Sequence, residues 1–368
     1  MRNGVERRLF IAATSQNDGK TTCALGLLKA FSDLAESIGF IKPVGQRCVT
    51  VDGQQIDEDT VLVQKACGLT CSLKCMSPVA IGRTFTRGFL DDPGGTLRRL
   101  EASIQESYEC VARDSDLVII EGTGHAGVGS VFDLSNARVA RLLNAKAVIV
   151  TRGGIGRPVD EIVLNRTLFE KENVPIVGVI ANKTFPWKID ETRDYLTRSL
   201  ARQGLDLLGV IPYMPRLTWP TVQQIADALD AKVLNGQPCL TNVVVNVIVG
   251  AMTANKALSF VRDKTLLVVP GDRDDIVLAA VCSDLLRKDM DVSGIVITGS
   301  LQLAPQTMDL VKLTHIPVLE VNMATYDTAF AIHDITVKIQ KTDEEKIQLA
   351  TALVREHVNF KKLWDALS

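Results

Sequence analysis

Short apolar runs alternate with segments of helical periodicity from the start of the chain to about residue 213. The apolar runs predict β-strands at residues 7–14, 116–122, 146–151, 175–183 and 206–213. Helical periodicity predicts helices at residues 21–39, 135–145, 158–172 and 189–204. This alternation predicts an α/β fold, a parallel sheet with helices on both faces. Ligands of such sheets bind at the carboxyl ends of the strands, so we expect the chemistry there.

The alternation is interrupted around residues 211–240, where four prolines surround one short amphipathic helix. Strand and helix patterns resume afterwards, and the chain closes with a long helical pattern at residues 343–367. We therefore expect a first domain over residues 1–215, a linker over 216–242 and a second, smaller α/β domain over 243–368.

The stretch TSQNDGKTT, residues 14–22, joins the first predicted strand to the first predicted helix. A phosphate-binding P-loop has the pattern G-x-x-x-x-G-K-[ST], and here Thr14 replaces the first glycine while Gly19, Lys20 and Thr21 match. Backbone amides and Lys20 would bind phosphate, and the Thr21 hydroxyl would reach Mg2+. The predicted nucleotide-binding residues of the loop are Thr14, Ser15, Gln16, Asn17, Asp18, Gly19, Lys20, Thr21 and Thr22. The alternative, a plain helix start capped by Asp18 or Gly19, does not explain why a strand precedes the loop.

Carboxylates and a second lysine follow other strands of the predicted sheet. Glu121 comes at the end of DLVIIEG, Asp57 and Asp59 lie in QQIDEDT, and Lys42 follows a short apolar run in IKPVGQR. Glu121 suits a carboxylate ligand of Mg2+, Asp57 and Asp59 offer more carboxylates, and Lys42 could bind an anionic substrate beside the γ-phosphate. The alternatives are a strand-end cap for Glu121, a solvated acidic loop and a surface lysine.

Asn182 and Lys183 end the strand PIVGVIANK, where P-loop proteins often read the base. A guanine-specific N-K-x-D loop needs an aspartate at the position that Phe185 occupies. Without a carboxylate to accept from guanine, adenine is the better prediction, and ATP the expected nucleotide.

Composition and charge exclude several classes of partner. Lys and Arg number 41 against 43 Asp and Glu, a formal net charge of −2, so the charge balance does not favour nucleic acid or an anionic membrane. No uninterrupted apolar run is long enough to span a bilayer. We expect a cytoplasmic protein whose partners are small molecules or proteins.

The cysteines cluster once, at Cys67, Cys71 and Cys75. Their C-x3-C-x3-C spacing matches none of the common zinc patterns. We expect a small buried patch there, without a metal.

The segments ATSQNDGKTT, IKPVGQ, IDED, IIEGTGH, TRGGIG, GVIANK and VIPYMPRLTWPTV, in this order, resemble the dethiobiotin synthetase-like P-loop domain over about residues 1–235. More closely, they resemble the version found at the amino terminus of some phosphotransacetylases and in stand-alone proteins. Thr at the first glycine position is a trait of that family. The resemblance implies Mg2+ and ATP as cofactors, with Thr21, Glu121 and Asp57 or Asp59 as the magnesium ligands. It also implies Lys20, Lys42 and Glu121 as catalytic residues, the two lysines being anion-stabilising cations. Asn182 would read the adenine, and Pro212 would also lie at the nucleotide.

The segments VVPGDRDDIVLAAV, VSGIVITGS and VNMATYDTAFAI resemble a DRTGG domain over roughly residues 243–355. The resemblance implies a regulatory domain, which in some proteins binds adenine nucleotides. The predicted ligand site consists of Asp272, Arg273, Gly299 and Ser300. Asp274 and Asp275 replace the Thr-Gly of the name, and aspartates that cap a helix are the alternative.

Two functions of different class follow. The first is an ATP-dependent ligase or phosphoryl-transfer enzyme acting on a small acid or amine. The second is a regulatory ATP-binding module, without catalysis, that acts on a partner such as a phosphotransacetylase. The sequence stops where full-length phosphotransacetylases continue into an acyl-transfer domain, so we expect no acetyl transfer. We expect a homodimer or a higher homo-oligomer.

Overall fold

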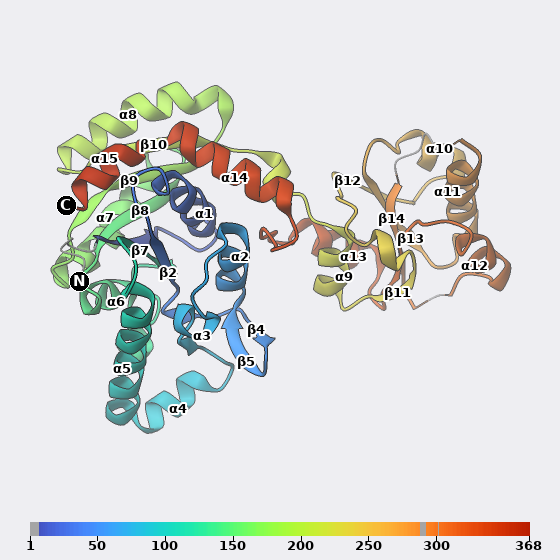
Figure 1. The fold of residues 1–368 in the computed structure, drawn as a ribbon. Helices are drawn as coiled ribbons and strands as arrows, with labels where there is room; N and C mark the ends of the chain where they lie inside the picture. Colours follow the sequence, from blue (N-terminus) through green and yellow to red (C-terminus); the bar gives the residue numbers. More distant parts are fainter. Residues whose placement is uncertain (1–6, 288–291, 301) are drawn as a thin grey trace. The chain divides into compact units, whose positions relative to one another are not determined.

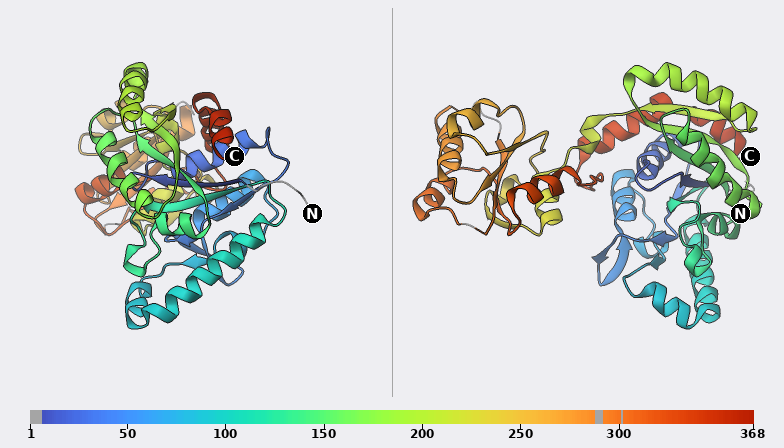
Figure 2. Two further views of the ribbon diagram at one scale, coloured as in Figure 1. Left: turned by 90° about the vertical axis from the view of Figure 1, so that its left-hand side faces the viewer. Right: turned by 180° about the vertical axis from the view of Figure 1, so that it is seen from behind.

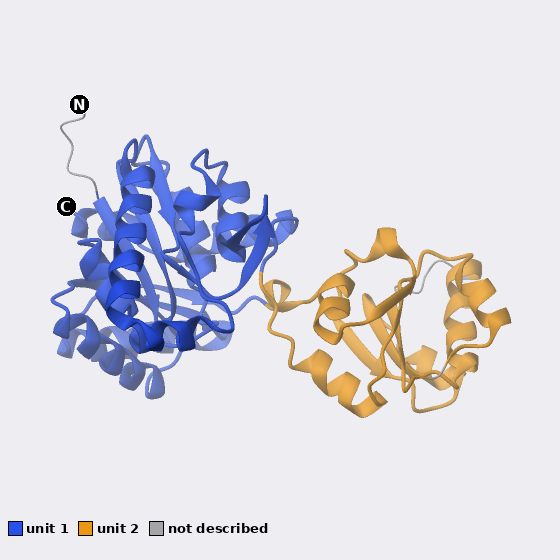
Figure 3. Cartoon of the chain, turned by 90° about the horizontal axis from the view of Figure 1, so that it is seen from below, with its two compact units in different colours: residues 1–214, 339–368 blue, residues 215–338 orange. Residues whose placement is uncertain are grey.

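The computed structural model describes residues 7–287, 292–300 and 302–368 (Figure 1). The chain divides into two compact units (Figure 3). The first unit consists of residues 1–214 and 339–368, and the second of residues 215–338. Within the described ranges, none of the helices has both the length and the apolar character that crossing a bilayer demands.

The first unit is built on a six-stranded parallel sheet with the order β10-β9-β8-β1-β7-β2. The strands are β1 (Arg7–Ala13), β2 (Ile38–Ile41), β7 (Leu117–His125), β8 (Lys146–Arg152), β9 (Ile176–Thr184) and β10 (Leu207–Pro212). β1, β7 and β8 form the middle of the sheet, and their apolar side chains are buried. The expected parallel sheet is confirmed, and each apolar run named above forms one of its strands.

Helices cover both faces of this sheet. They include α1 (Lys20–Phe31), α6 (Asn136–Leu142), α7 (Arg157–Lys171) and α8 (Ile189–Arg202). The chain passes through α1 toward the β2 edge, and through α6, α7 and α8 toward the β10 edge. Because parallel crossovers are right-handed, opposite directions place the helices on opposite faces. The expected helix over residues 21–39 is too long, since α1 ends at Phe31 and Ile38 begins the edge strand β2.

The segment between β2 and β7 forms an irregular layer beside the sheet. Its elements are β3 (Val44–Gly45), β4 (Cys48–Val51), β5 (Gln54–Asp57), α2 (Glu58–Cys67), α3 (Leu73–Met76), β6 (Val79–Ala80), α4 (Phe85–Asp91) and α5 (Pro93–Ala112). β4 and β5 form a hairpin, and Asp57 caps α2 by accepting a hydrogen bond from the Asp59 amide at 3.0 Å. This layer brings the predicted acidic residues to the sheet.

The carboxy-terminal helices belong to the first unit, which corrects the expected second domain over residues 243–368. They are α14 (Glu344–His357) and α15 (Phe360–Ala366). α14 packs against α1 and β10, and both helices, drawn in red, lie beside these elements (Figures 1 and 2). The predicted single helix is interrupted because Val358 bridges Gly209, and the Asn359 amide donates to Leu208 O at 2.8 Å.

Gly26 makes the contact between α1 and α14 possible. A Cβ at Gly26 would lie 2.2 Å from Val354 Cβ in α14. We expect Gly26→Ala to lower the free energy of unfolding by about 1–3 kcal/mol, because the two helices must move apart. Gly88→Ala in α4 is the matched control, since its Cβ would meet no atom within 4 Å. The control should stabilise by about 0.5–1 kcal/mol through helix propensity. Equal effects of both substitutions in urea unfolding would contradict the prediction.

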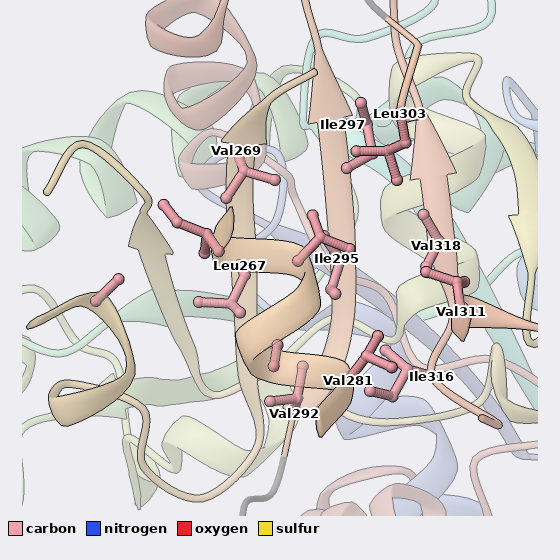
Figure 4. Close-up of a cluster of buried hydrophobic side chains, with 14 residues drawn as sticks. Leu267, Val269, Val281, Val292, Ile295, Ile297, Leu303, Val311, Ile316 and Val318 are labelled. Atoms are coloured by element: carbon pink, nitrogen blue, oxygen red, sulfur yellow. The ribbon is translucent and has the colours of Figure 1, made fainter. Parts of the chain in front are cut away.

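The second unit contains a five-stranded sheet with the order β11-β15-β14-β13-β12, parallel except for β11. The strands are β11 (Lys232–Asn235), β12 (Asn246–Val249), β13 (Thr265–Pro270), β14 (Val292–Thr298) and β15 (Val318–Glu320). Its helices are α9 (Val222–Leu229), α10 (Ala254–Ser259), α11 (Asp274–Arg287), α12 (Pro305–Val311) and α13 (Thr325–His333). One buried cluster includes Leu267, Ile295 and Val318, gathered against the sheet (Figure 4). The expected smaller α/β domain is confirmed.

The prediction of a linker over residues 216–242 is corrected by the structure. Much of this segment forms α9 and the edge strand β11 of the second unit. α9 begins with a capping box, in which Thr221 and Gln224 each accept a hydrogen bond from the other's backbone amide. Val222 and Ile225 on this helix are fully buried. The prolines at 212, 215, 220 and 238 lie on either side of α9 and made the segment resemble a linker in composition.

Candidate functional site

The loop of residues 14–19 connects β1 to α1 at the carboxyl end of the central strand. Gly19 has φ 102° and immediately precedes α1. A Cβ at Gly19 would lie 2.0 Å from Asn182 Nδ2, so only glycine fits this position. Thr14 does not adopt the left-handed conformation, and its amide donates to Val150 O at 2.9 Å. The first position of this loop therefore does not need a glycine.

The side chain of Asp18 stabilises the conformation of the loop through hydrogen bonds within it. Its carboxylate, which is fully buried, accepts hydrogen bonds from the Thr14 hydroxyl at 2.9 Å and the Ser15 amide at 2.7 Å. Its other oxygen accepts from Arg152 Nε at 3.1 Å. Asp18 thus positions the loop, and its negative charge is balanced by Arg152 on the neighbouring strand β8.

Three residues from β9 and α7 brace the same loop. Asn182 Nδ2 donates to Asp18 O at 2.8 Å, Lys183 Nζ donates to Asn17 O at 2.7 Å, and Asn165 Nδ2 donates to Thr14 O at 3.2 Å. Asn182 Oδ1 accepts from the Lys183 amide at 2.8 Å, so both ends of its amide are engaged. Asn165 was not predicted from the sequence, although a polar residue on the apolar face of a predicted helix could have indicated it. Adenine recognition by Asn182 stays a prediction.

Four chain segments bring an acidic cluster together around Lys42, at the same edge of the sheet as the loop. Lys42 Nζ lies 3.1 Å from Asp57 Oδ1 and 3.2 Å from Glu121 Oε1, and it also pairs with Asp59. The Thr21 hydroxyl donates to Glu121 Oε1 at 3.0 Å. Lys42, Asp57, Asp59 and Glu121 are all buried. The predicted metal-binding residues therefore converge.

Three carboxylates of the cluster share one buried ammonium group, that of Lys42. Burial alone would lower the pKa of Lys42, but the surrounding carboxylates raise it well above its usual value, so Lys42 stays charged. Burial raises the pKa of Glu121 and of Asp57, although Lys42 opposes the shift. The carboxylates outnumber the cation that they share, and a further cation is favoured there.

Lys20 lies close to this cluster. Its Nζ donates to Gly124 O at 2.9 Å. Burial is the largest cause that lowers the pKa of Lys20 to about 8, while Glu121 opposes it. An anion bound beside Lys20 would raise this pKa again, so phosphate binding and the charge of Lys20 favour each other.

The donor atoms of the cluster fit a magnesium ion. Hydroxyl and carboxylate oxygens are the ligands that Mg2+ takes. Glu121 Oε2 is buried and has no hydrogen-bond partner among the described residues. Thr21, Asp57, Asp59 and Glu121 would hold the ion, and it would compensate the excess negative charge.

An exposed aromatic group lies beside the residues that brace the loop. Phe185 and Trp187 are stacked with ring centroids 4.8 Å apart, and Phe185 meets Tyr213 edge-on at 5.9 Å. The exposed fraction is 50% for Phe185 and 75% for Trp187. The Tyr213 amide donates to Thr184 O at 2.7 Å, which places Pro212 and Tyr213 next to the end of β9. Sequence reasoning noted Phe185 only because it is not an aspartate.

Models of two known domain families match this chain. A family model described as an AAA domain (AAA_26) matches residues 7–221, more than half of the chain. The chain belongs to this AAA domain family. A second model, the DRTGG domain, matches residues 224–335. The expected pairing of a P-loop domain with a DRTGG domain is confirmed, and the DRTGG match begins inside the segment that was expected to be a linker.

The curated relatives of this AAA and DRTGG pair include phosphate acetyltransferases. That of Pseudomonas putida is 28% identical over 369 residues, which cover 95% of this chain and 50% of the relative. That of Escherichia coli is 23% identical over 382 residues, covering 96% of this chain and 52% of the relative. The chain spans about half the length of these relatives. Among solved structures, the match to the MinD cell division protein from Aquifex aeolicus covers 57% of this chain and 84% of that one, with 16% identity and a TM-score of 0.36.

The predicted ligand site of the DRTGG domain lies at the carboxyl edge of its sheet, after β13 and β14. Arg273 pairs with Asp275 at 2.8 Å, and its guanidinium also donates to Met252 O at 2.7 Å. Ser300 Oγ donates to Asn322 Oδ1 at 3.1 Å, while Asp272 and Gly299 are exposed. Arg273 and Ser300 therefore already have partners within the domain. An anionic ligand would have to compete with these contacts. This site stays a prediction.

The cysteine patch in the AAA domain differs from the expected one. Cys71, Cys75 and Cys110 have sulfur atoms within 4.8 Å of one another, and Cys75 forms a disulfide with Cys110. Cys67, at the end of α2, lies outside this group. None of these four cysteines is fully buried, so the expected buried patch of Cys67, Cys71 and Cys75 is wrong. The four-residue spacing of these cysteines does not place them on one helical face, because α2 ends before Gly68 and α3 begins at Leu73.

Proposed function

We propose that the AAA domain binds ATP with Mg2+ at the P-loop and the acidic cluster. The observation that carries this proposal is the convergence of Lys20, Thr21 and Glu121 at the end of the central strands. The amino terminus of α1 and the loop amides favour the phosphates electrostatically. Gly19 permits close approach of the backbone to the phosphates.

As an enzyme, the domain would couple ATP to a reaction of a small acid or amine, as a ligase or phosphoryl-transfer enzyme similar to dethiobiotin synthetase. Lys20 and Lys42 would stabilise negative charge on the transferred phosphoryl group, and Glu121 would orient Thr21 and Lys42. A magnesium ion held by Thr21, Asp57, Asp59 and Glu121 would supply further charge stabilisation. Lys42 can turn toward an anionic substrate once its carboxylate partners are shared with the ion.

A second candidate is a regulatory module that binds ATP without turnover. It is favoured by relatives that are phosphate acetyltransferases and that match both domains of this chain. In this version the DRTGG domain senses a nucleotide or mediates assembly. The partner would be an enzyme such as a phosphotransacetylase, and the chain would act as a homodimer or a larger homo-oligomer.

A turnover assay separates the two candidates. Purified protein is incubated with Mg2+ and ATP, with diamines plus bicarbonate or with a panel of carboxylic acids. Phosphate release stimulated above roughly a few turnovers per minute, slow beside typical enzymes, supports catalysis. Tight ATP binding with no stimulated release supports the regulatory module. Absence of ATP binding by calorimetry defeats both.

Glu121→Gln tests the magnesium ligand. We expect the Kd for ATP measured with Mg2+ to rise about tenfold, because an ionic ligand oxygen is lost. The Kd measured in EDTA should change much less, since Glu121 would contact the ion and would act on the phosphates only through Lys20 and Lys42. Glu106→Gln, on the exposed side of α5, is the control for the charge change. An equal change with and without Mg2+ would contradict the assignment.

A further inference from the structure

Three half-buried cysteines of the AAA domain meet beside the acidic cluster. The disulfide between Cys75 and Cys110 ties α3 to α5 across a sequence separation of 35 residues. Cys71 remains a thiol, and its sulfur lies within 4.8 Å of both disulfide sulfurs. A free thiol next to an accessible disulfide has the geometry for exchange.

The residues that follow Cys75 hold two members of the acidic cluster in place. The Lys42 amide donates to Met76 O at 2.8 Å, and the Asp57 amide donates to Ser77 Oγ at 3.0 Å. Met76 and Ser77 are both buried. A shift of α3 would therefore act on the backbones of Lys42 and Asp57 through these two hydrogen bonds.

We propose that Cys71, Cys75 and Cys110 form a thiol–disulfide exchange site whose state changes the geometry of the acidic cluster. The Cys71 thiolate attacks Cys110 Sγ, the bond between Cys75 and Cys110 breaks, and a bond between Cys71 and Cys110 forms. Cys75 leaves as a thiolate and takes up one proton, which balances the proton that Cys71 releases. The exchange itself neither gains nor loses electrons. A low-molecular-weight dithiol reduces either disulfide, and the dithiol is oxidised by two electrons.

Exchange transfers the disulfide bond to Cys110 from Cys75, in α3, to Cys71, in the loop before α3. α3 is four residues long, and its start is capped by Ser72 Oγ, which accepts from the Cys75 amide at 3.3 Å. So short a helix depends on outside contacts, of which the bond to Cys110 is the covalent one. Partial burial raises the pKa of the Cys71 thiol, so its thiolate is a minor species near neutral pH and the exchange is slow.

Peptide mapping of the full chain tests the exchange. Trypsin cleaves after Lys74, so Cys71 falls in the peptide 66–74, Cys75 in 75–83 and Cys110 in 100–113. After equilibration in a glutathione redox buffer and alkylation, we expect peptide 100–113 linked both to 75–83 and to 66–74. In Cys71→Ser the link to 66–74 should disappear, which excludes Cys67 as its source. Absence of both linked peptides after oxidation would overturn the proposal, and so would one Zn2+ bound per chain that prevents their formation.

Hydrogen exchange tests the coupling to the acidic cluster and does not depend on ATP. Amides in peptides spanning residues 40–60 should exchange faster after reduction with dithiothreitol. Cys110→Ser should show the fast exchange in both conditions, whereas Cys282→Ser, an exposed thiol of the other unit, should behave like the wild type. Unchanged protection after reduction, with linked peptides present before it, would overturn the coupling.

The consequence for nucleotide rests on the proposed function. We expect the Kd for ATP with Mg2+ to differ about fivefold or more between oxidised and reduced protein, and not at all in Cys110→Ser. If ATP fails to bind in both states while the linked peptides and the hydrogen exchange behave as expected, the proposed function fails and the exchange site stands. Equal ATP affinity in both states overturns the link between them.

Discussion

Lys20→Ala is expected to weaken binding of Mg2+-ATP by about a hundredfold, equivalent to about 2.7 kcal/mol, because the lost contact is charge-assisted. Lys20 Nζ lies at the loop, buried and 2.9 Å from Gly124 O. Burial lowers its pKa to about 8, so near neutral pH most of the lysine is charged. Bound phosphate would replace the lost hydration of this ammonium, and alanine offers no such partner.

Lys29→Ala is the matched control, because Lys29 is an exposed residue on the same helix. It removes the same charge from α1 and should leave the Kd for ATP unchanged. Calorimetric titration of both variants, with circular dichroism to confirm folding, measures the difference. Binding to Lys20→Ala with the wild-type Kd would sink the assignment of the loop.

The sequence predicted the elements whose signals are local. Apolar runs gave the central strands, and the Gly19-Lys20-Thr21 motif gave the start of α1, because period and turn chemistry act over a few residues. The shared site of Lys42 and Glu121 was predicted from the family resemblance, since no strand was predicted before Lys42. Their hydrogen bond spans 79 residues of sequence, and it forms because β2 and β7 end at the same edge of the sheet.

Long-range packing could not be predicted from local patterns. The helical period of residues 343–367 gave the helices but not their location, which depends on the fit of Val354 against Gly26. Asn165 and Cys110 were missed for the same reason, since each acquires its partners only when distant segments meet. The linker was wrong because proline content describes the ends of a segment and says little about the buried face of α9 between them.

Lys42→Met is expected to lower the free energy of unfolding near neutral pH by about 3–5 kcal/mol, because it leaves buried carboxylates without their cation. The same change at an exposed lysine of α2, Lys65→Met, should have little effect. Combining Lys42→Met with Glu121→Gln should recover part of the loss, since one uncompensated charge is removed. Urea unfolding of the three variants and the wild type measures these differences.

The loss in Lys42→Met should shrink as the pH falls. Burial already raises the pKa of Glu121 and of Asp57 in the wild type, and removing Lys42 raises both further. A carboxyl group whose pKa is higher in the folded state binds its proton there first, so acid favours the folded state until the unfolded chain is protonated as well. Mg2+ should act in the same direction, because it supplies positive charge to the same oxygens. A loss that grows with acid would show that Lys42 does not compensate these carboxylates, and the magnesium assignment would lose its electrostatic basis.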